Sequence, residues 1–269
     1  MSEFSAEWLA LRERYDLHAR DSSVLKAVID ACKDKPKLHI IDLGCGTGST
    51  LRALAPRLTA EQDWRFVDHD RTLLARAVES AAALQVRATA VTADLNREIE
   101  AVLQDTADLL TTSALLDLVS DEWLDRFADC VSARGMPVYA ALSYDGRIDI
   151  SPAHPADEAI VNALNQHQRS DKGFGRALGP LAETSAISKF MQRGFSVVQG
   201  PADWIASGED AAFQNAIVQG WAAAARETGT LAMQDVENWL AFRQDEIALG
   251  RASLRVGHVD FFAVPPSAV

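Results

Sequence analysis

Residues 38–48 read LHIIDLGCGTG, and this stretch decides the fold of the chain. Its first six residues predict a buried β-strand, and residues 49–58 suit a helix. Glycine accepts the positive φ angles of a tight turn and lets a ligand lie against the backbone, while the start of the helix offers free N–H groups to an anionic group. A strand, a glycine-rich turn and a helix in this order predict the first crossover of a Rossmann-like sheet, although dinucleotide-dependent enzymes use a similar turn.

The alternation of strands and helices continues along most of the chain. Further strands are expected at residues 64–68, 86–92, 107–112, 137–143, 195–199 and 256–264. Helical segments are expected at residues 5–31, 71–84, 121–133, 156–168 and 182–193. Strands and helices that alternate at this spacing predict an α/β fold with a mostly parallel sheet that is covered on both faces.

Composition and charge exclude several classes of protein. Three cysteines, Cys32, Cys45 and Cys130, are too few and too scattered for a disulfide framework or a metal cluster. The sequence has no basic leader and no apolar run of about 18 residues, so we expect a cytoplasmic protein that does not enter a membrane. A net charge of −12 repels polyanions, which makes nucleic acid a poor candidate for a partner. The oligomeric state is not fixed by the sequence.

Acidic residues next to the predicted strand ends narrow the choice of ligand. Asp68 ends the second strand, about 20 residues after the last glycine, where a carboxylate can accept both hydroxyls of a ribose. Asp94 ends the third strand and can accept from an adenine amino group. Asp42 lies two residues before the first glycine, which suits a cationic ligand better than a pyrophosphate. Alternatives stay open, because Asp70 can replace Asp68, Asp94 can be a helix N-cap, and Asp42 can merely stabilise the turn.

Four motifs together resemble those of the class I S-adenosylmethionine (SAM) dependent methyltransferases of the small-molecule type. They are IDLGCGTG at residues 41–48, VDHD at 67–70, TADL at 92–95 and DLLTTSALLD at 108–117. The resemblance covers residues 38–143 well and the last two strands more loosely. It implies a Rossmann-like sheet of seven strands, mostly parallel with the last strand antiparallel. It also implies SAM as the cofactor and S-adenosylhomocysteine (SAH) as its product.

The resemblance assigns residues of this chain to each part of the cofactor. These are Gly44, Gly46 and Gly48 for the methionine part, Asp68 for the ribose, Asp94 and the Leu95 backbone for the adenine, and Thr112 and Ser113 for the sulfonium end. Arg20, in the predicted N-terminal helix, can clamp the carboxylate of SAM, or it can be an ordinary surface charge.

Two departures from the regular alternation predict insertions. We expect an N-terminal helical segment at 1–36, a SAM-binding core at 37–145 that continues at 179–200, cap insertions at 146–178 and 201–254, and a last core strand with a tail at 255–269. Phe213, Ile217 and Trp221 fall on one face of a helix in the second insertion. Because ligands bind beyond the carboxyl ends of the strands, both insertions are placed to form a helical cap over the cofactor.

The densest polar cluster, NQHQRSDKGFGR at residues 165–176, lies in the first insertion. It can bind a polar or anionic substrate, with His167 as a general base and Arg169 and Lys172 as binding residues, or it can be a solvated loop. Asp117, after the fourth strand, can face the donor methyl group or start a helix. No Asn-Pro-Pro-Tyr-like element follows that strand, which departs from the families that methylate adenine or amide nitrogen.

These features predict SAM-dependent methyl transfer, by in-line displacement, to an oxygen or nitrogen atom of a small polar or anionic molecule. One alternative is a SAM-binding regulatory or assembly module without transferase activity, against which the large cap argues. Another is an NAD(P)-dependent oxidoreductase, which Asp42 and the third and fourth motifs disfavour. The identity of the acceptor leaves no trace in the sequence, since an activated donor needs little help from specific side chains.

Overall fold

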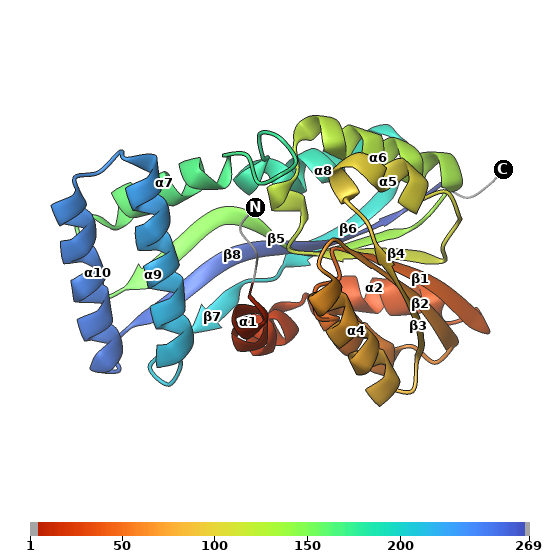
Figure 1. The fold of residues 1–269 in the computed structure, drawn as a ribbon, viewed down its shortest axis with the longest axis horizontal. Helices are drawn as coiled ribbons and strands as arrows, with labels where there is room; N and C mark the ends of the chain where they lie inside the picture. The colour runs from red at the N-terminus through yellow and green to blue at the C-terminus, as the bar shows by residue number, and fades with distance from the viewer. Residues whose placement is uncertain (1–4, 267–269) are drawn as a thin grey trace.

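A computed structural model describes residues 5–266, which form a mixed sheet of eight strands with helices around it (Figure 1). The strand order is β3-β2-β1-β4-β5-β8-β6, and β7 pairs with β8. The strands are β1 (Lys37–Leu43), β2 (Glu61–Asp68), β3 (Arg87–Thr92), β4 (Leu109–Ser113), β5 (Val138–Ser151), β6 (Ser196–Pro201), β7 (Trp204–Ala206) and β8 (Ser253–Val264). Strands β1 to β5 run parallel, and β8 is antiparallel to its neighbours. The predicted Rossmann-like sheet is therefore confirmed, with β7 as an addition.

Helices cover both faces of the sheet (Figure 1). On one face, α6 and α8 bury Phe127 and Phe190. On the other face, α2 and α4 bury Val28 and Leu74. The helices are α1 (Ala6–Ala19), α2 (Ser22–Cys32), α3 (Ser49–Leu54), α4 (Arg71–Ala83), α5 (Leu95–Val102), α6 (Asp121–Arg134), α7 (Asp157–Gln168), α8 (Ala182–Gln192), α9 (Ala211–Thr228) and α10 (Met233–Ala248), with short 3-10 turns η1 (Ala55–Arg57), η2 (Leu116–Leu118) and η3 (Gly179–Leu181).

The N-terminal helical region is two helices, whereas the sequence analysis treated residues 5–31 as one segment. The break falls at Arg20 and Asp21, whose backbone angles are extended. Oδ1 of Asp21 accepts from the backbone N–H groups of Ser23 and Val24, both at 2.9 Å. An aspartate in this position supplies the partners that the first turn of a helix lacks, and it therefore starts α2 as a separate helix.

Two short elements were not predicted from the sequence, helix α5 and strand β7. Strand β7 has three residues and pairs with β8 through Trp204↔Val256 and Ala206↔Leu254. Such a short run carries too little periodicity to be recognised, because a strand is identified by alternation over four or more residues.

Strands β5 and β8 are longer than expected and form a paired arm that leaves the core. Their pairing extends to Ser151↔Ser253, eight residues beyond the predicted end of the fifth strand at residue 143. Residues 146–151, assigned to the first insertion by the sequence analysis, thus belong to the sheet. Alternating exposed and half-buried residues at 147–151 give the period of two that a strand requires.

The arm carries three helices, α7, α9 and α10, which lie beyond the carboxyl end of β4 (Figure 1). Helix α9 packs against both α7 and α10. Phe213, Ile217 and Trp221 of α9 are buried in a core that also contains Trp204 and Trp239. We call these three helices with the arm the cap.

Helix α1 lies between the core and the cap (Figure 1). Its Tyr15 ring stacks on Phe213 of α9, with the ring centroids 3.6 Å apart. Glu13 pairs with Arg52 of α3, which directly follows the glycine-rich turn. Helix α1 thus contacts both parts of the molecule next to that turn.

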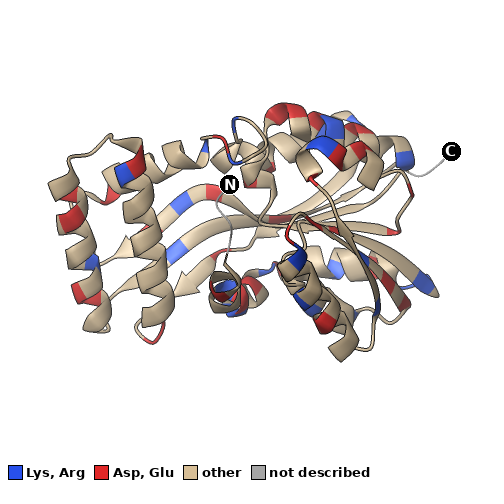
Figure 2. Cartoon of the chain, viewed as in Figure 1, with Lys and Arg blue, Asp and Glu red and all other residues tan. Residues whose placement is uncertain are grey.

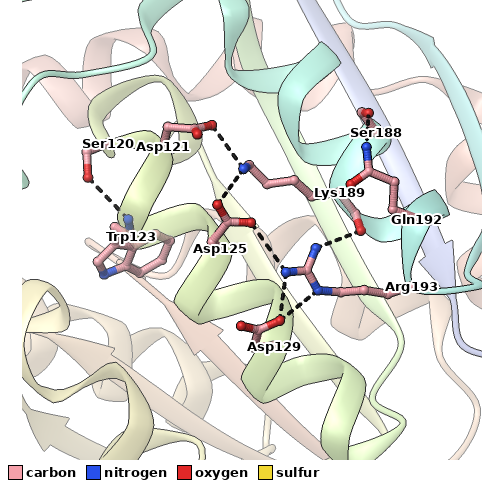
Figure 3. A network of polar contacts seen from close by, with 9 residues as sticks. All are labelled: Ser120, Asp121, Trp123, Asp125, Asp129, Ser188, Lys189, Gln192 and Arg193. Atoms are coloured by element: carbon pink, nitrogen blue, oxygen red, sulfur yellow. Dashed lines mark hydrogen bonds and ion pairs between the residues drawn. The ribbon is translucent and has the colours of Figure 1, made fainter.

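Ion pairs join α6 to α8 on the outer face of the core (Figure 3). The ammonium of Lys189 contacts Asp121 at 3.1 Å and Asp125 at 2.7 Å. The guanidinium of Arg193 contacts Asp125 at 3.3 Å and Asp129 at 2.6 Å. Acidic and basic residues are likewise interspersed over the other helices of the core and the cap (Figure 2).

Candidate active site

The glycine-rich turn joins β1 to α3 at the carboxyl edge of the sheet. Gly44, Gly46 and Gly48 have φ angles of +62°, +53° and +86°, which side chains with a Cβ atom rarely adopt. The backbone N–H groups of Gly44 and Cys45 donate to the carbonyl of Val67, at 2.8 and 3.2 Å. The turn is therefore fastened to the end of the neighbouring strand β2.

Asp68 ends β2 and faces this turn. Its Oδ2 accepts from the N–H of Gly46 at 2.9 Å, and its Oδ1 accepts from the N–H of Asp70 at 3.0 Å. Asp70 itself caps α4, because its Oδ1 accepts from the N–H groups of Thr72 and Leu73. Of the two acidic residues, Asp68 is the one that contacts the glycine-rich turn.

Asp42 and Thr112 each have one buried oxygen without a hydrogen-bond partner in the described part of the chain. Oδ1 of Asp42 accepts from Oγ1 of Thr111 at 2.8 Å, whereas its Oδ2 has no hydrogen-bond partner among residues 5–266. The same holds for Oγ1 of Thr112 on the adjacent strand β4. Burial raises the pKa of Asp42 to about 7. A buried polar atom without a partner costs about 1–3 kcal/mol, so a bound cation beside these oxygens would stabilise the site.

Arg20 lies between α1 and α2 and is buried, with 6% of its surface exposed, so it is not a surface charge. Its Nη1 donates to the hydroxyl of Tyr139 at 3.0 Å, and its Nη2 to Oγ of Ser113 at 3.5 Å. The Tyr139 hydroxyl in turn donates to Asp260 at 3.0 Å. The charge of Arg20 also lowers the pKa of Asp42, against the larger effect of burial. Arg20 therefore adds a positive charge that acts on the carboxylate of Asp42.

Asp94 is the N-cap of α5, and this confirms one of the two roles that the sequence left open for it. Its Oδ1 accepts from the N–H of Asn96 at 3.0 Å, and about half of its side chain is exposed. Leu95 is buried, and its carbonyl accepts from Nε1 of Trp123 at 2.7 Å. The capping bond occupies one carboxylate oxygen of Asp94, while Oδ2 lies 3.5 Å from Nε of the exposed Arg97.

Asp117 lies in η2, directly after β4. Helix α6 begins later, with Ser120 as its N-cap, so Asp117 does not start that helix. Its side chain is buried, and Oδ1 has no hydrogen-bond partner within the described part of the chain. Burial raises the pKa of Asp117 to about 6, and the charges of Arg12 and Lys172 oppose this rise. The carboxyl group can thus exchange a proton near neutral pH.

The polar cluster at residues 165–176 spans the end of α7 and the loop that follows it, and its side chains are only partly brought together. Nε2 of His167 lies 2.9 Å from Oε2 of Glu227 on α9, and Nδ1 lies 3.2 Å from Nζ of Lys172. Burial lowers the pKa of Lys172, while Glu227 and Asp117 raise it. Arg169, in contrast, is exposed at the end of α7, where its Cγ packs near Gly179. His167 and Lys172 therefore act together, and Arg169 does not join them.

The rest of this cluster is an ordered turn. Oδ1 of Asp171 accepts from the N–H groups of Gly173 and Gly175, at 2.7 and 3.1 Å. Nδ2 of Asn96 donates to the carbonyl of Gly173 at 2.8 Å, and Phe174 packs on Trp123. The turn consequently lies against α5, and its partner Asn96 is two residues from Asp94 in the chain.

Arg12 and Tyr144, whose charges or pKa values are coupled to Asp117, were not predicted from the sequence, nor were Ser143 and His258, which neighbour Tyr144 in the sheet. Oγ of Ser143 is buried without a partner among residues 5–266, and the Tyr144 hydroxyl donates to Oδ1 of Asn165 at 2.7 Å. Burial lowers the pKa of His258 to about 3, so its ring is neutral. Each lies in a helix or strand where its residue type gives no functional signal; their proximity comes from the antiparallel pairing of Tyr144 with His258 and from the packing of α1.

None of the helices among residues 5–266 is both long enough and apolar enough to cross a membrane. No group of three or more His, Cys, Asp or Glu side chains there is arranged to hold a metal ion.

Comparisons with known proteins give one family match and several structures of similar fold. The family described as "Methyltransferase domain" matches residues 40–135, which include the glycine-rich turn and Asp117. A cyclopropane-fatty-acyl-phospholipid synthase-like protein from Lactobacillus casei has a TM-score of 0.53 and 14% identity, covering 96% of this chain and 94% of that one. The cyclopropane synthase MmaA2 from Mycobacterium tuberculosis has a TM-score of 0.50 and 10% identity, covering 94% and 93%. At these identities the two structures show a shared fold. A search of curated proteins found no significant match.

Residues 40–135 thus form a methyltransferase domain. This domain contains the motifs at residues 41–48, 67–70, 92–95 and 108–117, from which a SAM-dependent methyltransferase was predicted, and the chain shares the fold of the two structures above. This assignment gives no support to the NAD(P)-dependent oxidoreductase that the glycine-rich turn alone had left open.

Proposed function

We propose that the protein transfers a methyl group from SAM to an oxygen or nitrogen atom of a small polar or anionic molecule, bound where the core meets the cap. One observation carries the proposal. Asp117 is a buried carboxyl group with an unpartnered oxygen, directly after β4 and close enough to Lys172 for the two charges to interact. Ligands of open α/β sheets bind beyond the carboxyl ends of the strands, where this residue lies.

We assign the cofactor to the glycine-rich turn and the acidic strand ends around it. In this assignment Gly44, Gly46 and Gly48 take the methionine part, Asp68 the ribose, Asp94 and Leu95 the adenine, Arg20 the carboxylate, Asp42 the ammonium, and Thr112 and Ser113 the sulfonium end. The unpartnered oxygens of Asp42 and Thr112 support it, because a cationic ligand would give both a partner. Burial keeps the pKa of Asp42 high, and a neighbouring cation would favour its ionised form.

Bound SAM supplies a methyl group that is already activated for displacement. The protein then has to align the acceptor, exclude water and take up a proton where the acceptor carries one. Asp117 suits the last task, because its pKa of about 6 allows it to accept a proton at neutral pH. The cap segments, residues 152–178 and 201–254, would enclose the acceptor once residues 146–151 are assigned to the sheet.

Asp117 is favoured over His167 as the proton acceptor. Both ring nitrogens of His167 are engaged, one by Glu227 and the other by Lys172. We therefore infer that His167 holds Lys172 in place, and that Lys172 attracts an anionic acceptor. The three cysteines are unpaired, which supports a cytoplasmic location.

The test compares the wild type with Asp117→Asn, using SAM labelled in its methyl group and a panel of small amines, phenols and carboxylic acids. We expect SAH to bind both forms equally and Asp117→Asn to lower transfer to phenols and amines by about tenfold or more. SAH binding without transfer to any small molecule would instead favour a SAM-binding regulatory module. If the wild type does not bind SAH, the cofactor assignment is contradicted.

A further inference from the structure

The guanidinium of Arg12 forms an ion pair, but its hydrogen-bonding capacity is not used by the described residues. It projects from α1 with 12% of its side chain exposed, and its Nε lies 3.1 Å from Oδ2 of Asp16. Nε is buried without a hydrogen-bond partner among residues 5–266, so its contact with Asp16 is an ion pair without hydrogen-bond geometry. A largely buried guanidinium normally pairs most of its donors, so the terminal nitrogens Nη1 and Nη2 of Arg12 are available for a ligand.

The surroundings of Arg12 fix the direction in which it can bind. Its Cζ lies 5.7 Å from the ring centroid of Trp204, and Trp204 in turn packs on His258, with ring centroids 4.5 Å apart. Asp16 is anchored too, because its Oδ1 accepts from Nε1 of Trp204 at 3.0 Å. The guanidinium is thus held by a carboxylate at Nε and supported by a ring, while its terminal nitrogens stay available.

Arg12 also lies close to the group that we propose as the proton acceptor. Its charge acts on Asp117, as does that of Lys172. The charges of two cations, one from α1 and one from the loop after α7, therefore act on one buried carboxyl group in η2. In a protein with a net charge of −12, an anionic acceptor needs such a local excess of positive charge to be captured.

We propose that Arg12 binds an oxyanionic group of the methyl acceptor, a carboxylate or a phosphate, through Nη1 and Nη2. The proposal rests on the proposed function and adds to it the residue that selects the acceptor. The planar fork of a guanidinium matches both oxyanions with two parallel hydrogen bonds, which a lysine ammonium cannot do. Asp16 contacts Nε and leaves these two nitrogens to the ligand.

The test measures binding of four probes to the SAH-bound enzyme by calorimetry. The probes are acetate, glycine, inorganic phosphate and O-phosphoethanolamine, so that carboxylates and phosphates are compared with and without an amine. We expect at least one probe to bind the wild type in the millimolar range, and Arg12→Gln to weaken that binding about tenfold or more. Preference for the first or the last pair identifies the oxyanion as a carboxylate or a phosphate.

Two further variants separate recognition from structure. Asp16→Asn removes the same ion pair but keeps the guanidinium, and it should retain most of the probe affinity. Arg12→Lys should restore only part of it, because one point charge replaces the fork. Equal loss in Asp16→Asn and Arg12→Gln, unchanged binding in Arg12→Gln, or no binding of any probe to the wild type would overturn the proposal. If SAH itself fails to bind, the proposed function fails instead.

Discussion

The backbone N–H of Gly46 donates a hydrogen bond of 2.9 Å to Oδ2 of Asp68. This bond connects the glycine-rich turn after β1 to the end of β2, the two places that the cofactor assignment requires to be adjacent. The carboxylate therefore has a fixed orientation before any ligand arrives, which lowers the cost of ordering the site on binding.

Replacing Asp68 by alanine should weaken binding of SAH by about 1–3 kcal/mol, because ribose hydroxyls would lose their acceptor. Calorimetric titration of SAH measures the change directly. Asp70→Ala is the matched control, since Asp70 caps α4 and should affect stability by about 1 kcal/mol rather than affinity. Unchanged SAH affinity in a folded Asp68→Ala protein would remove this residue from the site.

Methyl transfer to a proton-bearing acceptor should increase as the pH rises through about 6. Burial raises the pKa of Asp117 to that value, and only the ionised carboxylate can accept a proton. The rate under saturating SAM, measured between pH 5 and 8, should therefore follow a single ionisation on the acidic side. The Asp117→Asn protein should lose this ionisation, and a wild-type profile without it would argue against Asp117 as the base.

Asp117 should also lower the free energy of unfolding of the protein at neutral pH. The carboxyl of Asp117 has a higher pKa in the folded chain than the ordinary value of about 3.9, so its ionisation favours unfolding as the pH rises from about 4 to about 6. Urea unfolding should show Asp117→Asn to be more stable than the wild type at pH 8, with the difference shrinking toward pH 4. A variant that is less stable at pH 8 would show that Asp117 is paired in the fold.

The ion pairs between α6 and α8 should have the opposite pH dependence (Figure 3). The bond from Lys189 holds the pKa of Asp125 below its ordinary value, so the pairing stabilises the fold above about pH 4 and is lost as the pH falls through the lowered pKa. Asp125 is 47% exposed, and Asp125→Asn should therefore lower the free energy of unfolding by no more than about 1 kcal/mol at pH 7. Lys26→Gln, which breaks an exposed pair within α2, is the control and should have a smaller effect.

The fold of the core could be predicted because its signals are local. Strands β1 to β4 each contain β-forming apolar or aromatic residues and lie next to a helix in the chain, and the glycine-rich turn at Gly44 to Gly48 marks the first crossover. The extension of β5 to Ser151 was missed, because polar residues such as Arg147 and Asp149 alternate with isoleucines and resemble a solvated loop. Strand β7 depends on pairing with β8, a contact between distant residues.

The cofactor part and the acceptor part of the site also differ in how far the sequence predicts them. The residues assigned to the cofactor follow strand ends in order along the chain, so spacing and residue type were sufficient to propose them. Arg12, Asp117, Lys172 and His258 come from four separate segments, and only tertiary packing brings them together. The local cluster around His167 suggested a base, but the pairing of its ring with Glu227 is not visible in a sequence.

The central claim, methyl transfer to a small molecule, is tested most directly by following the label. The protein is incubated with SAM labelled in its methyl group and with an extract of source cells from which protein and nucleic acid have been removed. Radioactivity is then measured in small molecules separated from SAM. We expect the wild type to transfer label into this fraction and Gly46→Ala, which places a Cβ at a φ of +53° near Leu9, to transfer much less. The account is contradicted if the label stays in SAM when only the extract is present but moves to protein or nucleic acid when these are added back.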